Sequence, residues 1–238
     1  SNIAIGFEAG SSLTDQGSNV FIGSQAGKNV NEDSNVAIGK QALFSGATSS
    51  NSVAIGRRAL YSTTTGDNNI AVGRSALETN QEGSNSVAIG HEALESQNPS
   101  SATTMYNVGI GHNAGKSVTT GIDNTLIGGL AGDALTDADS NVAVGKDALS
   151  ADTLGSNSTA IGSSALRTQN FTSATNTFNV AVGTSAGLSI TTGIQNLLVG
   201  ALAGDALTDA DENTAIGTGA LTNDTLGSKS VAVGRSTL

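Results

Sequence analysis

The sequence has no cysteine and no tryptophan, a single proline, a single methionine, and only 3% aromatic residues. Without cysteine, disulfide bonds and thiolate metal sites are excluded. With so few aromatic side chains, a core has to be built from Val, Ile, Leu and Ala. Glycine, in contrast, is abundant at 31 of 238 residues. This composition favours thin, repeated all-β layers over a globular enzyme.

Positive charge and long apolar stretches are also scarce. The chain has 10 Lys and Arg against 20 Asp and Glu, which gives a formal net charge of −10. Nucleic-acid-binding proteins usually present a basic face, so we expect no nucleic-acid partner. No stretch approaches the apolar length of a membrane span, and we expect no membrane insertion by this segment.

A short motif, Asn-Ser-Val-Ala-Ile-Gly, recurs along the whole chain. It is identical at residues 51–56 and 85–90. The copies end at glycines 16 or 17 residues apart, with two longer spacings of 21. These glycines are Gly6, Gly23, Gly39, Gly56, Gly73, Gly90, Gly111, Gly128, Gly145, Gly162, Gly183, Gly200, Gly217 and Gly234. So regular a period predicts one all-β domain over residues 1–238, a parallel β-roll or β-solenoid of 14 coils.

A second period lies above the first. Residues 90–161 resemble residues 162–233, which indicates an internal duplication. Both ends of the sequence interrupt a repeat, whereas solenoids normally carry terminal caps. We therefore expect the chain to be a segment of a longer fibre.

Each repeat has the features of one coil. Val36-Ala37-Ile38 alternates and is rich in β-branched residues, which predicts a short strand. Gly39 then stands where every repeat has glycine, so we expect a positive φ or a close approach of main chains. Asn35 before the strand is a turn residue that could form a ladder from coil to coil. An Ala-Leu or Ala-Gly pair after the glycine predicts a second buried segment.

The middle residue of each strand suggests assembly. If Val36 and Ile38 point into the coil, Ala37 points outward, and this outward position is apolar in every repeat. Such a strand is buried on both faces, so the residues predict a homo-oligomer. A tightly packed monomer with a second internal layer is the alternative. The interface candidates are Phe21, Ala37, Ala54, Ala71, Ala88, Leu126, Ala143 and Leu198.

The repeated motif, followed at a fixed distance by Ala, resembles the head repeats of trimeric autotransporter adhesins, the YadA-like heads. Related repeats occur in bacteriophage tail fibres. The resemblance covers all the repeats and implies a left-handed homotrimeric β-roll, extracellular on a bacterial cell surface or a virion, that attaches to a host. The longer coils and the Ala-Leu and Ala-Gly pairs depart from the adhesin pattern and favour a viral fibre or an unusual surface protein.

Basic residues directly follow the repeat glycine in five consecutive coils: Lys40, Arg57, Arg74, His91 and His112. Parallel stacking would place them in one column about 4.8 Å apart. The column could bind an acidic glycan or phosphate as host receptor. Alternatively, its members pair with carboxylates from a neighbouring coil or chain, which is the interpretation we favour.

Metal sites have little support in the sequence. His91 and His112 could hold a metal ion as stacked imidazoles, but no carboxylate accompanies them at a fixed spacing. The clusters Asp133, Asp137, Asp139 and Asp205, Asp209, Asp211 lack the spacing of an EF-hand. We interpret both groups as ordinary surface residues and expect no metal and no cofactor.

The two long coils insert residues 95–106 and 167–178 between core segments. Loops that leave a rigid scaffold often carry recognition, and Tyr106, Phe171 and Phe178 lie here. These rings could contact a protein or glycan receptor. Otherwise they fold back over the coil or contact the next chain.

No constellation of catalytic residues is apparent, so we expect a structural and adhesive fibre segment and not an enzyme. Two alternatives stay open. A β-helical glycan-degrading enzyme of the tailspike kind would need paired carboxylates in a groove. A purely structural spacer would need no binding site at all.

Overall fold

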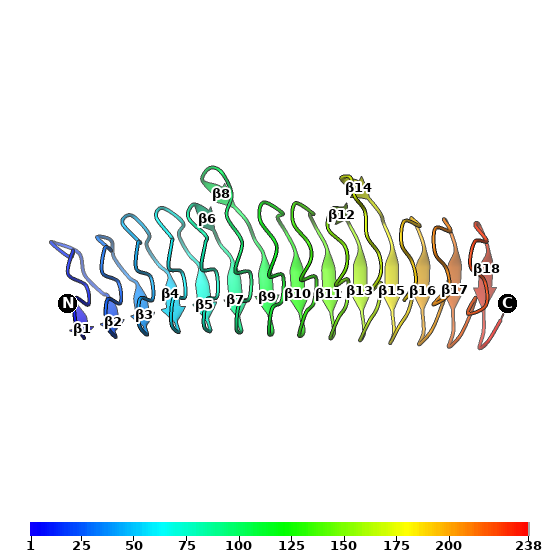
Figure 1. Cartoon of the computed structure of the whole chain (residues 1–238), viewed down its shortest axis with the longest axis horizontal. Coiled ribbons are helices and arrows are strands. Elements are labelled where there is room, and N and C mark those ends of the chain that lie inside the picture. Colours follow the sequence, from blue (N-terminus) through cyan, green and yellow to red (C-terminus); the bar gives the residue numbers. More distant parts are fainter. Residues whose placement is uncertain (238) are drawn as a thin grey trace. The chain divides into compact units, whose positions relative to one another are not determined.

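The computed structural model describes residues 1–237, and within them the regular structure is strand throughout, with no helix. The chain divides into two compact units, Ser1–Ile122 and Asp123–Leu238. Each unit is a stack of coils that each contribute one three-residue strand (Figure 1). The prediction of a parallel β-solenoid with a 17-residue repeat is confirmed.

The first unit contains seven such strands and one pair of shorter ones. The three-residue strands are β1 (Ile3–Ile5), β2 (Val20–Ile22), β3 (Val36–Ile38), β4 (Val53–Ile55), β5 (Ile70–Val72), β7 (Val87–Ile89) and β9 (Val108–Ile110). The short pair is β6 (Gly83–Ser84) and β8 (Thr103–Thr104).

The second unit repeats this plan. Its three-residue strands are β10 (Thr125–Ile127), β11 (Val142–Val144), β13 (Thr159–Ile161), β15 (Val180–Val182), β16 (Leu197–Val199), β17 (Thr214–Ile216) and β18 (Val231–Val233). Its short parallel pair is β12 (Gly155–Ser156) and β14 (Thr175–Asn176). In each unit the coil with the second short strand, β8 or β14, rises beyond its neighbours in Figure 1.

Successive coils stack in strict register. β3 pairs parallel with β4 so that Ala37 lies opposite Ala54, one repeat further along. An asparagine precedes ten of the fourteen three-residue strands, with serine before the other four, and it fixes this register. The side-chain oxygen of Asn35 accepts from the backbone N–H of Ser52 at 3.0 Å, and its amide donates to the carbonyl of Ser49 at 2.8 Å. The predicted ladder is therefore real, but it joins side chain to main chain.

The repeat glycine meets both expected requirements. Gly128 has a φ of +137°, and a Cβ there would lie 2.5 Å from the carbonyl oxygen of Gly145 in the next coil. Stacked coils therefore touch through their main chains at this turn, in a conformation that side chains rarely adopt.

The predicted direction of the strand side chains is wrong. The middle residue faces the coil's own core, and the residues on either side face outward. All eight proposed interface residues have 0% exposure within one chain: Phe21, Ala37, Ala54, Ala71, Ala88, Leu126, Ala143 and Leu198. Outward residues such as Ile55 and Ile70 are 37% and 40% exposed. The buried set therefore cannot form the surface that a second chain contacts.

The reason for this orientation is the thinness of the coil. The strand faces the second segment directly, and both Ala42 and Leu43 in that segment are fully buried. In three of the six coils whose segment reads Ala-Gly, those with Gly27, Gly132 and Gly204, a large middle residue of the strand fills the space. A Cβ on Gly27 would lie 2.6 Å from the Phe21 ring, and one on Gly132 would lie 2.7 Å from Leu126. The interior at these levels accommodates one large side chain, so Phe21 and Leu126 face glycine, whereas Ala37 faces Leu43.

Candidate functional site

The five basic residues of the predicted column all lie in the first unit, each directly after the repeat glycine that follows a strand. Main-chain bonds stack these turns, because the carbonyl of Lys40 accepts from the N–H of Arg58 at 3.1 Å and that of Arg57 from Ser75 at 3.0 Å. Lys40, Arg57 and Arg74 are exposed, and His91 is half-buried. The structure therefore brings these residues together as a column.

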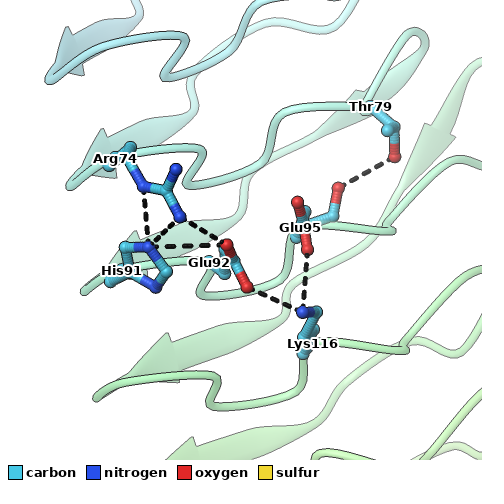
Figure 2. Close-up of polar contacts among 6 residues, drawn as sticks. All are labelled: Arg74, Thr79, His91, Glu92, Glu95 and Lys116. Carbon is cyan, nitrogen blue, oxygen red and sulfur yellow. Dashed lines mark hydrogen bonds and ion pairs between the residues drawn. The ribbon is translucent and has the colours of Figure 1, made fainter.

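The end of the column around His91 is a network of hydrogen bonds and ion pairs (Figure 2). Arg74 donates its Nε to Nε2 of His91 at 2.7 Å and contacts Oε1 of Glu92 through Nη2 at 2.8 Å. Lys116 contacts the other oxygen of Glu92 at 2.7 Å and Glu95 at 3.5 Å. The hydrogen bond from Lys116 holds the pKa of Glu92 below its ordinary value and raises that of Lys116.

Carboxylates accompany only part of the column. Arg74 pairs with Glu92 as the pairing interpretation expects, but in the described part of the chain Lys40 and Arg57 take part in no ion pair. Pairing from a neighbouring coil therefore explains one end of the column and leaves the other end uncompensated.

The two histidines stack and do not converge. Their ring centroids are 5.2 Å apart and their planes differ by 6°. Imidazole nitrogens bind metal in the plane of the ring, at about 2.1 Å, so parallel rings at this separation direct their lone pairs side by side. Nδ1 of His91 is buried without a hydrogen-bond partner. Among residues 1–237 no group of three or more His, Cys, Asp or Glu could hold a metal ion.

A second ladder, beside the column, was not predicted from the sequence. The Phe44 and Tyr61 rings stack with centroids 5.1 Å apart and planes 11° apart. Lys28 lies over Phe44 at 5.9 Å, and the Arg58 guanidinium lies over Tyr61 at 4.4 Å. Carboxylates complete both ends, since Glu8 contacts Lys28 and Glu78 contacts Arg58, each at 2.7 Å. The recurrence of Phe44 and Tyr61 at one position of successive repeats was the sequence signal.

The aromatic residues of the long coils have different environments. Tyr106 and Phe178 are 62% and 53% exposed, and both have positive φ, at 51° in each case. Phe171 is only 6% exposed, which corrects its prediction as a ligand-contacting ring. The N–H of Phe171 donates to the buried carboxylate of Asp152 at 3.1 Å, which anchors the main chain at this point of the loop.

One pair of carboxylates in the second unit shares a hollow. Leu130, Asp133, Asp147, Ser150 and Arg167 line a depression of about 230 Å³. Partial burial raises the pKa of Asp133, and the nearby Asp147 adds to the effect. One carboxylate oxygen of Asp133 is buried without a hydrogen-bond partner. The sequence placed Asp133 in a cluster with Asp137 and Asp139, which we interpreted as surface residues. Asp137 is exposed, Asp133 is half-buried, and in the described chain they are not part of a group of three that could hold a metal ion.

Comparisons with protein-family models, curated proteins and solved structures find no match to this chain. Over the described residues, the structure contains no helix long and apolar enough to cross a membrane.

Proposed function

We propose that this chain is a structural and adhesive segment of a homotrimeric fibre, extracellular at a bacterial cell surface or on a virion, that attaches to a host. The observation that carries the proposal is the outward face of the strands in each unit. In the first unit every outward strand residue is Val or Ile. These residues are Ile3, Ile5, Val20, Ile22, Val36, Ile38, Val53, Ile55, Ile70, Val72, Val87, Ile89, Val108 and Ile110.

Such a face is unusual for a strand that remains in water. Along a strand with one face in water, residues ordinarily alternate between apolar and polar, and the polar ones face the water. Large exposed apolar patches mark interaction sites. Here two continuous rows of β-branched side chains are half-buried or exposed. In the second unit the corresponding rows include Thr125, Thr159 and Thr214 but are otherwise Val, Ile or Leu. A second copy, with identical rows at identical spacing, matches this surface along its length.

Assembly is therefore proposed through other residues than the interface candidates of the sequence. The small buried residues shape the core of one chain, and the Val and Ile rows offer the surface to the next. The number three, the left hand of the roll and the attachment role rest on the resemblance to YadA-like heads. The repeated coils supply length and stiffness, because each coil bonds only to its neighbours.

Light scattering on the purified chain, together with substitutions on the outward rows, tests the proposal. Ile55→Asp with Ile89→Asp should convert a trimer to a folded monomer, since the charges lie outside the coil core. Thr65→Asp with Thr120→Asp, on exposed turns, serves as the control and should remain trimeric. A wild-type chain that scatters as a monomer contradicts the proposal.

The glycan-degrading alternative has one concrete candidate pair, Asp133 and Asp147. Paired carboxylates with separated pKa values are the requirement for glycoside cleavage. Incubating the wild-type protein and Asp133→Asn with soluble polysaccharides, followed by analysis of chain length, decides the matter. We expect no cleavage by either protein. Cleavage that disappears in Asp133→Asn would replace the adhesive proposal with an enzymatic one.

A further inference from the structure

The charge balance of the first unit is the starting observation. Its Lys and Arg residues are Lys28, Lys40, Arg57, Arg58, Arg74 and Lys116. Four of these have a carboxylate partner at 2.7–2.8 Å, namely Lys28, Arg58, Arg74 and Lys116. The two without one among residues 1–237, Lys40 and Arg57, are consecutive members of the column. In a chain with twice as many acids as bases, these two cations lie side by side.

Two neighbouring positive charges destabilise the folded chain unless a negative charge lies close to them. Neighbouring strands lie about 4.8 Å apart, so like charges at one position of consecutive coils repel each other, and the repulsion is only partly screened by salt. Arg74 extends the column by one coil, with its side chain 45% exposed beyond its contact to Glu92. The result is a narrow strip of positive charge that runs from coil to coil.

We propose that Lys40, Arg57 and the exposed part of Arg74 bind a linear anionic polysaccharide, carboxylated or sulfated, laid along the stack with one anionic group to each coil. The proposal rests on the adhesive role proposed above and names its ligand. Guanidinium groups bind carboxylate and sulfate oxygens through paired hydrogen bonds, and a column of them matches a polymer that repeats its charge at about the length of one sugar ring.

The surroundings of the strip favour a polysaccharide over a nucleic acid. Single-stranded nucleic acids are held by aromatic rings on which bases stack. The rings nearest in sequence, Phe44 and Tyr61, stack on one another, and Lys28 and Arg58 lie over them. Their faces are therefore occupied. The strip is also one residue wide, which is narrower than the basic face that duplex nucleic acid requires.

The second unit provides a matched control. Lys146 and Arg235 occupy the same position in their coils as Lys40 and Arg57, directly after the repeat glycine. They are far apart in sequence, and the intervening repeats have Ser163, Thr184, Ala201 and Thr218 at this position. Replacing Lys146 and Arg235 changes the net charge by as much as replacing Lys40 and Arg57, but it interrupts no strip of positive charge.

The experiment measures binding of the full chain to polygalacturonate, dextran sulfate, neutral dextran and single-stranded oligothymidylate, with light scattering on the same samples. We expect Lys40→Ser with Arg57→Ser to weaken binding of an anionic polysaccharide by roughly tenfold and to reduce its salt dependence. Lys146→Ser with Arg235→Ser should change it by less than about twofold. The carboxylated and sulfated polymers distinguish the two anionic groups.

Three results would overturn the polysaccharide proposal. They are an equal loss of polysaccharide affinity in both double variants, binding of neutral dextran, and tighter binding of oligothymidylate than of the polysaccharides. Loss of the oligomer in Lys40→Ser with Arg57→Ser would also overturn it, because the two cations would then pair across chains. If the oligomer is intact but binds neither polyanion, the polysaccharide proposal is refuted and the fibre proposal is not. If the chain is a monomer that still binds through Lys40 and Arg57, the fibre proposal is refuted and the polysaccharide proposal is supported.

Discussion

One glycine in each coil occupies the point where the main chains of successive coils touch. At Gly128 the positive φ and the carbonyl of Gly145 both exclude a side chain. Immediately after it, Gly129 has open space, with no atom within 4 Å of the position that a Cβ would take. Of these two adjacent glycines, Gly128 is required by the structure and Gly129 is not.

Gly128→Ala should lower the free energy of unfolding by about 3 kcal/mol or more, since backbone strain and overlap with main-chain atoms combine. Gly129→Ala should change it by less than about 0.5 kcal/mol, as is usual for open surface positions. Urea denaturation followed by circular dichroism measures both. Similar losses in the two variants would show that the close approach at Gly128 is not limiting.

The raised pKa of Asp133 predicts a pH-dependent effect. A carboxyl whose pKa is higher in the folded than in the unfolded chain stabilises the fold when protonated, and this contribution is lost as pH rises through its folded pKa. Asp133→Asn should therefore increase stability at neutral pH and have little effect well below the ordinary Asp pKa. The gain should be modest, because the group is only partly buried. Melting temperatures at pH 7 and pH 3 test the sign, and a destabilised variant at pH 7 would refute it.

At the scale of the element, the long coils depend on a buried amide. Gln97 is fully buried, accepts from Asn107 at 2.9 Å, and donates to Ser86 at 3.1 Å and Asn80 at 3.3 Å. The equivalent Gln169 makes the same kind of contacts in the second unit, with Asp152 in the place of Asn80. This network replaces the apolar packing that Val30 or Leu135 supplies in shorter coils.

Gln97→Ala should destabilise the first unit by about 2–3 kcal/mol, because several buried polar groups lose their partner together. Gln41→Ala is the matched control. Its amide makes one bond to Gln25 at 3.0 Å in a half-buried position, and we expect a loss of about 0.5 kcal/mol. Hydrogen exchange around β6 and β8 reports the local effect. Unchanged protection in Gln97→Ala would contradict the role of the network.

The strand shows which features of a coil the sequence predicts and which it does not. The period of 17, the short strand, the turn glycine and the asparagine ladder could all be derived, because each rests on local chemistry repeated in every coil. The direction of Val36, Ala37 and Ile38 could not, since alternation defines two faces but does not say which is inside when all three residues are apolar. Core volume decides which face is inside. The sequence signal was the pairing of residue sizes across the coil, since alanine in the strand faces leucine whereas Phe21 faces Gly27.

The candidate site shows the same limit. Repeat spacing predicted the column from Lys40 to His112, and the structure places these residues together. Which cations are neutralised depends on side-chain conformation: Glu78 contacts Arg58, and the adjacent Arg57 takes part in no ion pair in the described chain. Likewise, the spacing of the repeats does not indicate that the amides of Gln97 and Gln169 contact Asn107 and Asn179, because these contacts depend on how the long loops fold back.

At the scale of the molecule, a solenoid should tolerate the loss of a whole coil better than the loss of part of one. Deleting residues 57–73 joins Gly56 to Arg74 and removes one complete period, so that β4 can pair with β7 in the register that β4 and β5 have now. Deleting residues 57–65 removes about half as many residues. It takes away the buried Ala59 and Leu60 and shifts the contacts that span the deletion, such as the pairing of β4 with β5, out of register.

We expect the 17-residue deletion to keep the β-rich circular dichroism spectrum and cooperative melting, with a modest fall in melting temperature, because coil interfaces add approximately one by one. The shorter deletion should open the first unit to limited proteolysis, since its coil would lack one of its two buried segments. If the shorter deletion proved equally resistant, stacking in register would not be what holds the coils together. The stability of this chain would then lie within single coils, which the shared hydrogen bonds between coils argue against.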